Sequence, residues 1–147
     1  MITIRNFTDS DYAALCELDA PMFSGMGGPI LFRHIQDLFG ELFFVAEQEG
    51  QLIGYVLGGV HLEDPARGKL IRIGVFNGYQ RKECGTKLTD MLFSRMREMG
   101  VKTVHLTVAE TNLPAISFYK KLGFVQTDYR ENYFYPDIPR LFLEKEL

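Results

Sequence analysis

Three extended runs followed by one long amphipathic helix constrain the fold of this chain more than any other feature. Two strand-like runs, Leu42 to Glu47 and Leu52 to Val60, flank Gln48-Glu49-Gly50-Gln51, a good hairpin turn. A third run, Lys69 to Phe76, alternates as a strand does. A long helix then follows and stops at Gly100, with one apolar face formed by Leu88, Met91, Leu92, Met96 and Met99. Consecutive antiparallel strands and a crossover helix predict a sheet with helices packed on it.

The remaining segments extend the same pattern to both ends of the chain. Extended segments are expected at Ile2 to Phe7, Thr103 to Val108, Phe124 to Tyr129 and Leu141 to Leu147, the last two joined by an aromatic loop. Helices are expected after the N-cap Thr8, over Ile30 to Phe39, and between the N-cap Asn112 and the C′ residue Gly123. The sequence therefore predicts one α/β (α+β) domain over residues 1–147, with a mixed, largely antiparallel sheet of six to seven strands and helices on both faces.

Charge and composition exclude several classes of function. A formal net charge of −3 argues against a nucleic-acid binder, because such proteins usually carry a basic face. The longest apolar run, Leu42 to Ala46, is far shorter than the roughly 20 residues that span a bilayer, and no signal peptide is visible. Two cysteines, Cys16 and Cys84, are too few for a disulfide framework, so we expect a reduced, cytoplasmic setting.

The segment from Ile71 to Leu88 is a candidate anion site. It runs from a strand through a loop into a helix, whose first N–H groups have no intrahelical partner and favour an anion. Arg81, Lys82 and Lys87 add positive charge, although an ordinary loop with solvated basic residues fits the segment equally well. The order Gly85-Thr86-Lys87 does not match a Walker loop.

A second segment, Leu106 to Phe124, carries a family resemblance. Its Asn, Ala, Phe-Tyr and Gly-Phe positions have the spacing found in the GNAT superfamily of acyl-CoA-dependent N-acyltransferases: Asn112, Ala115, Phe118, Tyr119, Gly123 and Phe124. Upstream, Val75, Tyr79, Gln80 and Gly85 match part of the acyl-CoA loop of that family. The resemblance covers roughly residues 42–147, and the order of elements extends it to the N-terminus.

The resemblance implies that acetyl-CoA is the co-substrate and that no metal is needed. It assigns catalysis to Tyr119, as general acid for the departing thiolate, and to the N–H of Val75, which polarises the thioester carbonyl. The residues implied in binding acetyl-CoA are Ile73, Val75, Gln80, Arg81, Lys82, Glu83, Cys84, Gly85, Thr86, Asn112, Ala115, Phe118 and Tyr119. Core packing at helical spacing for Phe118 and Tyr119 and helix capping for Asn112 are the alternative interpretations. His34, His61 and His105 show no metal-ligand spacing.

Two departures from the family pattern affect this interpretation. Glu83 replaces a glycine of the loop, which places a negative charge beside the anion site and opposes a positive φ. No carboxylate stands where the family often places its general base; Thr107 holds one such position, and Glu110 is three residues out of register. Because an α-amine with a pKa of about 8 is neutral far more often at pH 7 than a lysine with a pKa of about 10.4, a weak base suits an α-amine.

The acceptor is expected to be a small-molecule or peptide amine. The C-terminal segment, Tyr129 to Leu147, resembles the branch that acetylates protein N-termini, including ribosomal proteins, and its aromatic loop either walls an acceptor cleft or completes the core. The rival hypothesis is a non-catalytic module of the same fold that senses acyl-CoA or binds a partner. A homodimer is left open; nucleic acid and membranes are not expected as partners.

Overall fold

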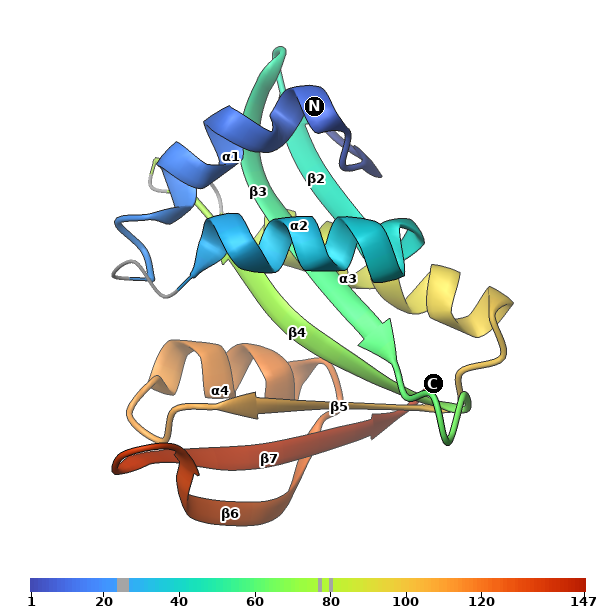
Figure 1. Cartoon of the computed structure of the whole chain (residues 1–147), viewed down its shortest axis with the longest axis vertical. Coiled ribbons are helices and arrows are strands. Elements are labelled where there is room, and N and C mark those ends of the chain that lie inside the picture. Colours follow the sequence, from blue (N-terminus) through green and yellow to red (C-terminus); the bar gives the residue numbers. More distant parts are fainter. Residues whose placement is uncertain (24–26, 77, 80) are drawn as a thin grey trace.

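One mixed sheet forms the centre of the molecule (Figure 1). The computed structural model describes residues 1–23, 27–76, 78–79 and 81–147, and for Arg81 and Lys82 only the backbone. Within these residues the strands are β1 (Ile2–Asn6), β2 (Phe43–Gln48), β3 (Gln51–Val60), β4 (Arg67–Val75), β5 (Thr103–Val108), β6 (Val125–Phe134) and β7 (Ile138–Glu146). Their order is β1-β2-β3-β4-β5-β7-β6, with β4 and β5 parallel and the other neighbours antiparallel.

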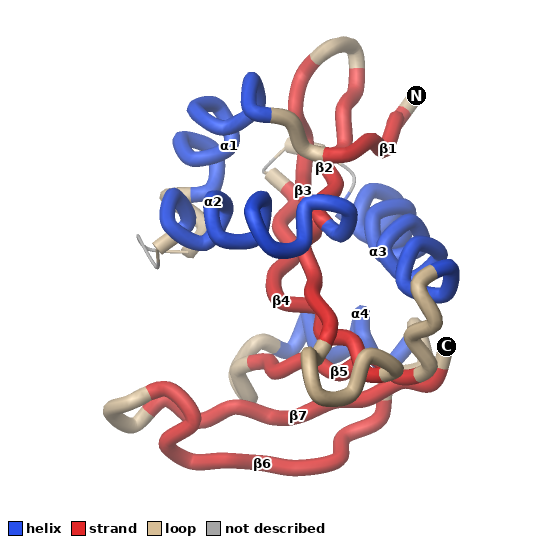
Figure 2. The backbone as a smooth tube through the Cα atoms, turned by 45° about the vertical axis from the view of Figure 1, so that its right-hand side comes forward, coloured by secondary structure: helices blue, strands red, loops and turns tan. Residues whose placement is uncertain are grey.

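Helices cover both faces of the sheet (Figure 2). The described helices are α1 (Tyr12–Asp19), α2 (Gly28–Phe39), α3 (Arg81–Glu98) and α4 (Leu113–Lys121), with short 3₁₀ turns at Asp9–Asp11 and Gly40–Leu42. Helices α1 and α2 lie on one face and α3 on the opposite face. The predicted order of elements and the predicted sheet are thus confirmed. No described helix is long and apolar enough to cross a membrane.

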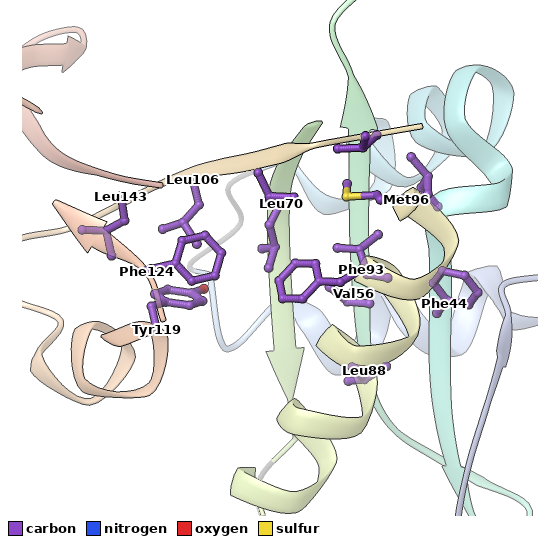
Figure 3. Packing of buried hydrophobic residues seen from close by; sticks show 14 of the residues in the cluster. Phe44, Val56, Leu70, Leu88, Phe93, Met96, Leu106, Tyr119, Phe124 and Leu143 are labelled. Carbon is purple, nitrogen blue, oxygen red and sulfur yellow. The ribbon is translucent and has the colours of Figure 1, made fainter. Parts of the chain in front are cut away.

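Two apolar clusters hold the helices on the sheet. Under α1 and α2, Tyr55 packs edge-on against Phe32 with a ring-centroid distance of 5.2 Å, and both are fully buried. Under α3 and α4 a larger cluster runs from Phe44 on β2 across the sheet to Tyr119 on α4 (Figure 3). Burial of this apolar surface is the main favourable term in the stability of the fold.

The predicted hairpin turn is confirmed at its backbone. Glu49 and Gly50 have φ of 52° and 78°, the left-handed pair that a tight two-residue turn requires between twisted strands.

The predicted aromatic loop near the C-terminus is wrong, because residues 129–134 continue β6 and only residues 135–137 turn. Pairing with β7 supplies the backbone hydrogen bonds that extend β6.

Two other boundaries differ slightly from expectation. Helix α2 begins at Gly28, two residues early, and accommodates Pro29 because the first turn of a helix needs no donor there. Strand β4, which the sequence places at Lys69 to Phe76, ends one residue earlier, at Val75. The N–H of Phe76 still donates a hydrogen bond to the carbonyl of Ile53 on β3, at 2.9 Å.

Candidate active site

Strands β4 and β5 pair at one end and then separate. Their register contains three residue pairs, Arg67 with Thr103, Gly68 with Val104, and Lys69 with His105. Beyond these pairs β4 continues to Val75 without a β5 partner, and Figure 1 shows the two strands diverging. The backbones of β4 and β5 therefore separate like the arms of a V, and we call this separation the β4–β5 gap.

A β-bulge in β4 lies where the gap begins. Leu70 opposes Gly58 and Arg72 opposes Leu57, which leaves Ile71 as an extra residue of β4. Ile71 packs in the cluster under α1 and α2, and Arg72 bonds Tyr55 of the same cluster. A bulge bends its strand and increases its twist, so this extra residue provides the physical reason that β4 turns away from β5.

The backbone of Val75 faces the gap. In a strand, successive N–H groups point to opposite edges, and the N–H of Phe76 bonds the carbonyl of Ile53 on β3. The N–H groups of Val75 and Ile73 therefore point to the other edge, toward β5. Their side chains pack against the cluster under α3 and α4, so the strand is held while these donors stay available to a ligand.

A buried ion pair fixes the opposite face of β4. Arg72 contacts the carboxylate of Asp19 at the end of α1 and donates from Nε to the Tyr55 hydroxyl at 2.9 Å. The guanidinium also lies 3.8 Å from the ring centroid of Phe23. These contacts tie the end of α1 to the strand that borders the gap.

Helix α3 begins six residues after the end of β4, and its first turn is where the sequence predicts an anion site. Its first turn contains Glu83, which is exposed, and Cys84, which is fully buried. Glu83 lies inside the helix, so the concern that this position needs a positive φ is wrong. Burial raises the pKa of Cys84 to about 11, so its thiol fills the core and is not a nucleophile. Gln80 lies outside the described residues, as do the side chains of Arg81 and Lys82.

The two motif segments meet where α3 and α4 pack. A side chain at Gly85 would place its Cβ 3.2 Å from Cζ of Phe118, so the glycine leaves room for the Phe118 ring of α4 against the beginning of α3. Asn112 caps α4 by accepting a hydrogen bond from the Ala115 N–H at 3.3 Å. At Thr86, another residue predicted to bind acetyl-CoA, the carbonyl oxygen accepts a hydrogen bond from the Thr89 hydroxyl at 3.0 Å.

Tyr119 is buried beside the same junction. It is 7% exposed and packs edge-on against Phe124, with ring centroids 5.7 Å apart (Figure 3). Burial raises its pKa to about 12, and the positive charge of Arg140 opposes that rise. Within the described part of the chain its hydroxyl forms no hydrogen bond, so the phenol keeps its proton and has a free donor.

Thr107, which holds a position considered for a general base, is hydrogen-bonded to an arginine. Thr107 on β5 accepts hydrogen bonds from Arg140 of β7, at 3.1 Å to Oγ1 and 2.8 Å to the carbonyl oxygen. Sequence reasoning missed Arg140 because no motif spacing marks it; only the pairing of β7 with β5 brings it here. Across the described residues, no group of three or more His, Cys, Asp or Glu side chains is arranged to hold a metal ion.

A separate cavity of about 710 Å³ lies between α1 and the β2–β3 turn. It approaches the β4–α3 connection at Phe76 and Tyr79, and otherwise is lined by residues such as Asp11, Glu17 and Leu52. Its lining excludes Val75, Gly85 and Tyr119, so it is distinct from the site built around the β4–β5 gap.

Comparisons with known proteins agree with this geometry. The model of the Acetyltransferase (GNAT) family matches residues 12–124. An N-alpha-acetyltransferase of Sulfurisphaera tokodaii is 33% identical over 112 residues, which are 69% of this chain and 66% of that protein. The [Ribosomal protein bS18]-alanine N-acetyltransferase of Escherichia coli is 32% identical over 93 residues, 63% of this chain and 61% of the relative.

Among solved structures, the crystal structure of Ard1 from Thermoplasma volcanium superposes with a TM-score of 0.91 at 25% sequence identity. The superposition covers 99% of this chain and 97% of the Ard1 chain. The likeness therefore includes the C-terminal hairpin, which the family match does not reach.

Proposed function

Because this chain belongs to the Acetyltransferase (GNAT) family, we propose that it transfers an acetyl group from acetyl-CoA to the α-amine of a protein or peptide N-terminus. The observation that carries the proposal is the β4–β5 gap, with the N–H of Val75 on one side and the buried phenol of Tyr119 near the other. The relatives that act on protein N-termini support the choice of acceptor.

The beginning of α3 fits the pyrophosphate of acetyl-CoA. An 18-residue helix presents free N–H groups in its first turn and a positive dipole end. Gly85 brings α4 against this turn through Phe118, so that groups on both helices border one ligand. Glu83 faces solvent, which leaves its backbone N–H available to the phosphate while its charge weakens the site.

The gap supplies the chemistry of transfer. The N–H of Val75 donates to the thioester oxygen, where negative charge develops as the amine attacks. Tyr119 donates its proton toward the sulfur as the thiolate leaves. Both groups are held by packed elements, so little reorganisation is needed when the charge forms.

The acceptor amine must arrive neutral. The described residues place Thr107 and Arg140, not a carboxylate, where a base was considered. At pH 7 an α-amine with a pKa of about 8 is neutral about one time in ten, and a lysine with a pKa of about 10.4 far less often. The site is therefore suited to α-amines that lose their proton to water.

Acetylation of defined peptides tests this function. The purified chain is incubated with acetyl-CoA and a peptide whose only amine is its N-terminus, and with a matched peptide whose only amine is a lysine side chain. We expect free thiol to form and mass to increase by one acetyl group with the first peptide only. Tyr119→Phe serves as the low-activity control. Acetylation of the lysine peptide alone would contradict the assignment of an α-amine.

Two observations favour a second candidate function, a module that binds acyl-CoA without turnover. Neither β4 nor Thr107 on β5 provides a carboxylate base, and Glu83 adds negative charge at the anion site. Binding of acetyl-CoA by calorimetry, with no thiol released in the presence of any N-terminal peptide, would support this module and reject the enzyme.

A further inference from the structure

Arg140 is held in place by two hydrogen bonds, which use only part of the hydrogen-bonding capacity of its guanidinium. Two of the five N–H groups of a guanidinium are bonded to Thr107, one from Nε and one from Nη2. In the described part of the chain, the remaining three have no partner, and they include the end-on pair that matches a carboxylate. Arg140 also lies 5.2 Å from the ring centroid of Phe134, which limits its rotation.

The other arginines on this face are already neutralised. Arg67 contacts Glu144 at 2.8 Å and Arg130 contacts Asp128 at 3.1 Å. Arg140 and the half-buried Lys69, by contrast, form no ion pair with any carboxylate that the structure describes. These two cations therefore have no ion-pair partner among the described residues, although the whole chain has a formal net charge of −3.

Each of the two unpaired cations lies near an aromatic ring, Arg140 near Phe134 and Lys69 near Tyr133. Tyr133 packs edge-on against Phe142, with ring centroids 4.9 Å apart, and Nζ of Lys69 lies 5.9 Å from the centroid of Tyr133. Phe142 and Arg140 are on β7 and Lys69 is on β4, so the cluster spans the face of the sheet beside the β4–β5 gap. Figure 1 shows β5, β7 and β6 unobstructed on the side where α1 and α2 lie.

The cluster borders the β4–β5 gap, because Arg140 bonds Thr107 of β5, which lies beyond the last β4–β5 residue pair. Burial lowers the pKa of Arg140, and its positive charge opposes the rise in the pKa of Tyr119. A cation that is half removed from water and has no anionic partner is costly, and a bound carboxylate offsets that cost. Because each residue of an extended peptide spans about 3.3 Å, such a carboxylate belongs to one of the first residues of the acceptor.

We propose that Arg140, on the same face of the sheet as Lys69, binds an acidic side chain of the acceptor, so that the chain prefers peptides with Asp or Glu within their first three residues. The proposal rests on the proposed function and names the substrate class of the same site. A charge-assisted, bidentate contact is expected to give a preference of about 10- to 100-fold over a neutral residue, which at 1.4 kcal/mol per tenfold is about 1.4 to 2.8 kcal/mol.

The test compares amidated peptides that differ only at residues 2 and 3, where they carry Glu, Gln or Lys. For wild type we expect kcat/KM to be at least about tenfold higher with Glu than with Gln. Arg140→Gln lowers the ratio of kcat/KM for the Glu peptide over the Gln peptide to about one, and Arg140→Glu shifts the preference to Lys. Arg130→Gln, which removes a paired cation from the same face, is the matched control and keeps the preference for Glu.

Binding of the same peptides by fluorescence anisotropy separates this proposal from the proposed function. Tighter binding of the Glu peptide that depends on Arg140, without acetylation, supports the acidic site and rejects the enzyme. Acetylation with equal kcat/KM for Glu and Gln peptides overturns the acidic site and leaves the enzyme standing. A chain that neither binds nor acetylates these peptides overturns both. Acetylation of free amino acids in preference to peptides also overturns the peptide assignment, since Arg140 would then bind an α-carboxylate.

Discussion

At the scale of single residues, Tyr119 gives the sharpest test of catalysis. Its pKa of about 12 keeps the phenol protonated at every pH used for assays. We expect Tyr119→Phe to lower kcat roughly 100-fold, the usual contribution of a general acid, and to leave the KM for acetyl-CoA nearly unchanged. Because the hydroxyl bonds no described residue, the melting temperature should also be unchanged. Steady-state kinetics decide the matter, and an unaltered kcat would return Tyr119 to a packing role.

The charge of Glu83 makes a prediction about affinity. The side chain is exposed in the first turn of α3, beside the proposed pyrophosphate position. We expect Glu83→Gly to tighten binding of CoA, and Glu83→Gln to do the same, since both remove the charge and only one alters the backbone. The gain should disappear at high salt, which screens exposed charges. Affinities measured by calorimetry that equal or fall below wild type would show that Glu83 does not weaken the site.

His105 predicts a loss of stability at low pH. It is 8% exposed, its Nε2 lies 2.7 Å from Nε2 of His61, and Arg67, Lys69 and Glu144 are its other charged neighbours. Burial lowers its pKa from 6.5 to about 4. Between these values the unfolded chain binds a proton that the folded chain does not, so stability falls as the pH falls.

The expected loss between pH 7 and pH 5 is roughly 2 kcal/mol. Urea unfolding at both pH values measures it. His105→Gln should flatten the dependence in this range, whereas His34→Gln, which changes an exposed histidine on α2, should not. A wild-type protein equally stable at both values would contradict the burial of a neutral His105.

The sequence identified single residues only where a motif or a cap marked them. Asn112 and Gly85 were found by spacing, and their capping and packing roles are visible in the structure. Arg140 was not found, because its position depends on which strand pairs with β5 and in what register. The catalytic role of Val75 stays a prediction, although its backbone faces the gap as that role requires.

At the scale of elements, α4 contacts the beginning of α3 through the Phe118 ring, which lies against Gly85. A Cβ at Gly85 would lie 3.2 Å from Phe118, closer than ordinary contact. We expect Gly85→Val to destabilise the protein by about 1 to 3 kcal/mol, the usual cost of overpacking, and to weaken acetyl-CoA binding because the Phe118 ring is displaced from the first turns of α3. Thermal unfolding and calorimetry measure these effects. Gly40→Ala is the control, since no atom lies within 4 Å of a Cβ there and its φ is −56°.

Element types were more predictable than the geometry of their pairing. Periodicity gave the order of strands and helices, because each period reflects which face is buried. The extra residue Ile71 in β4 was not predictable, since a bulge depends on the register between two strands. The continuation of β6 past Tyr129 was missed for the same reason: its partner strand, β7, is what holds it extended.

At the scale of the whole molecule, the sheet has two parts joined by a short parallel ladder. Strands β1–β4 form one part, covered by α1, α2 and α3, and β5, β7 and β6 form the other. Three residue pairs connect β4 with β5, while the cluster under α3 and α4 spans both parts. A ligand in the β4–β5 gap would contact both parts at once, and its binding should therefore stabilise the molecule as a unit.

Acetyl-CoA is accordingly expected to raise the melting temperature of the entire domain. A ligand at 100 times its Kd stabilises the native state by about 2.7 kcal/mol, which for a chain of this length corresponds to a rise of roughly 5 to 10 °C. Differential scanning calorimetry should show one transition that moves with ligand concentration. Pantetheine, which lacks the pyrophosphate, should give a smaller shift if the first turn of α3 supplies much of the affinity, and Gly85→Val should reduce the shift with acetyl-CoA. A melting temperature that does not change at millimolar acetyl-CoA, with no heat of binding, would contradict both the enzyme and the module that binds acyl-CoA without turnover, because each requires acetyl-CoA to occupy this site.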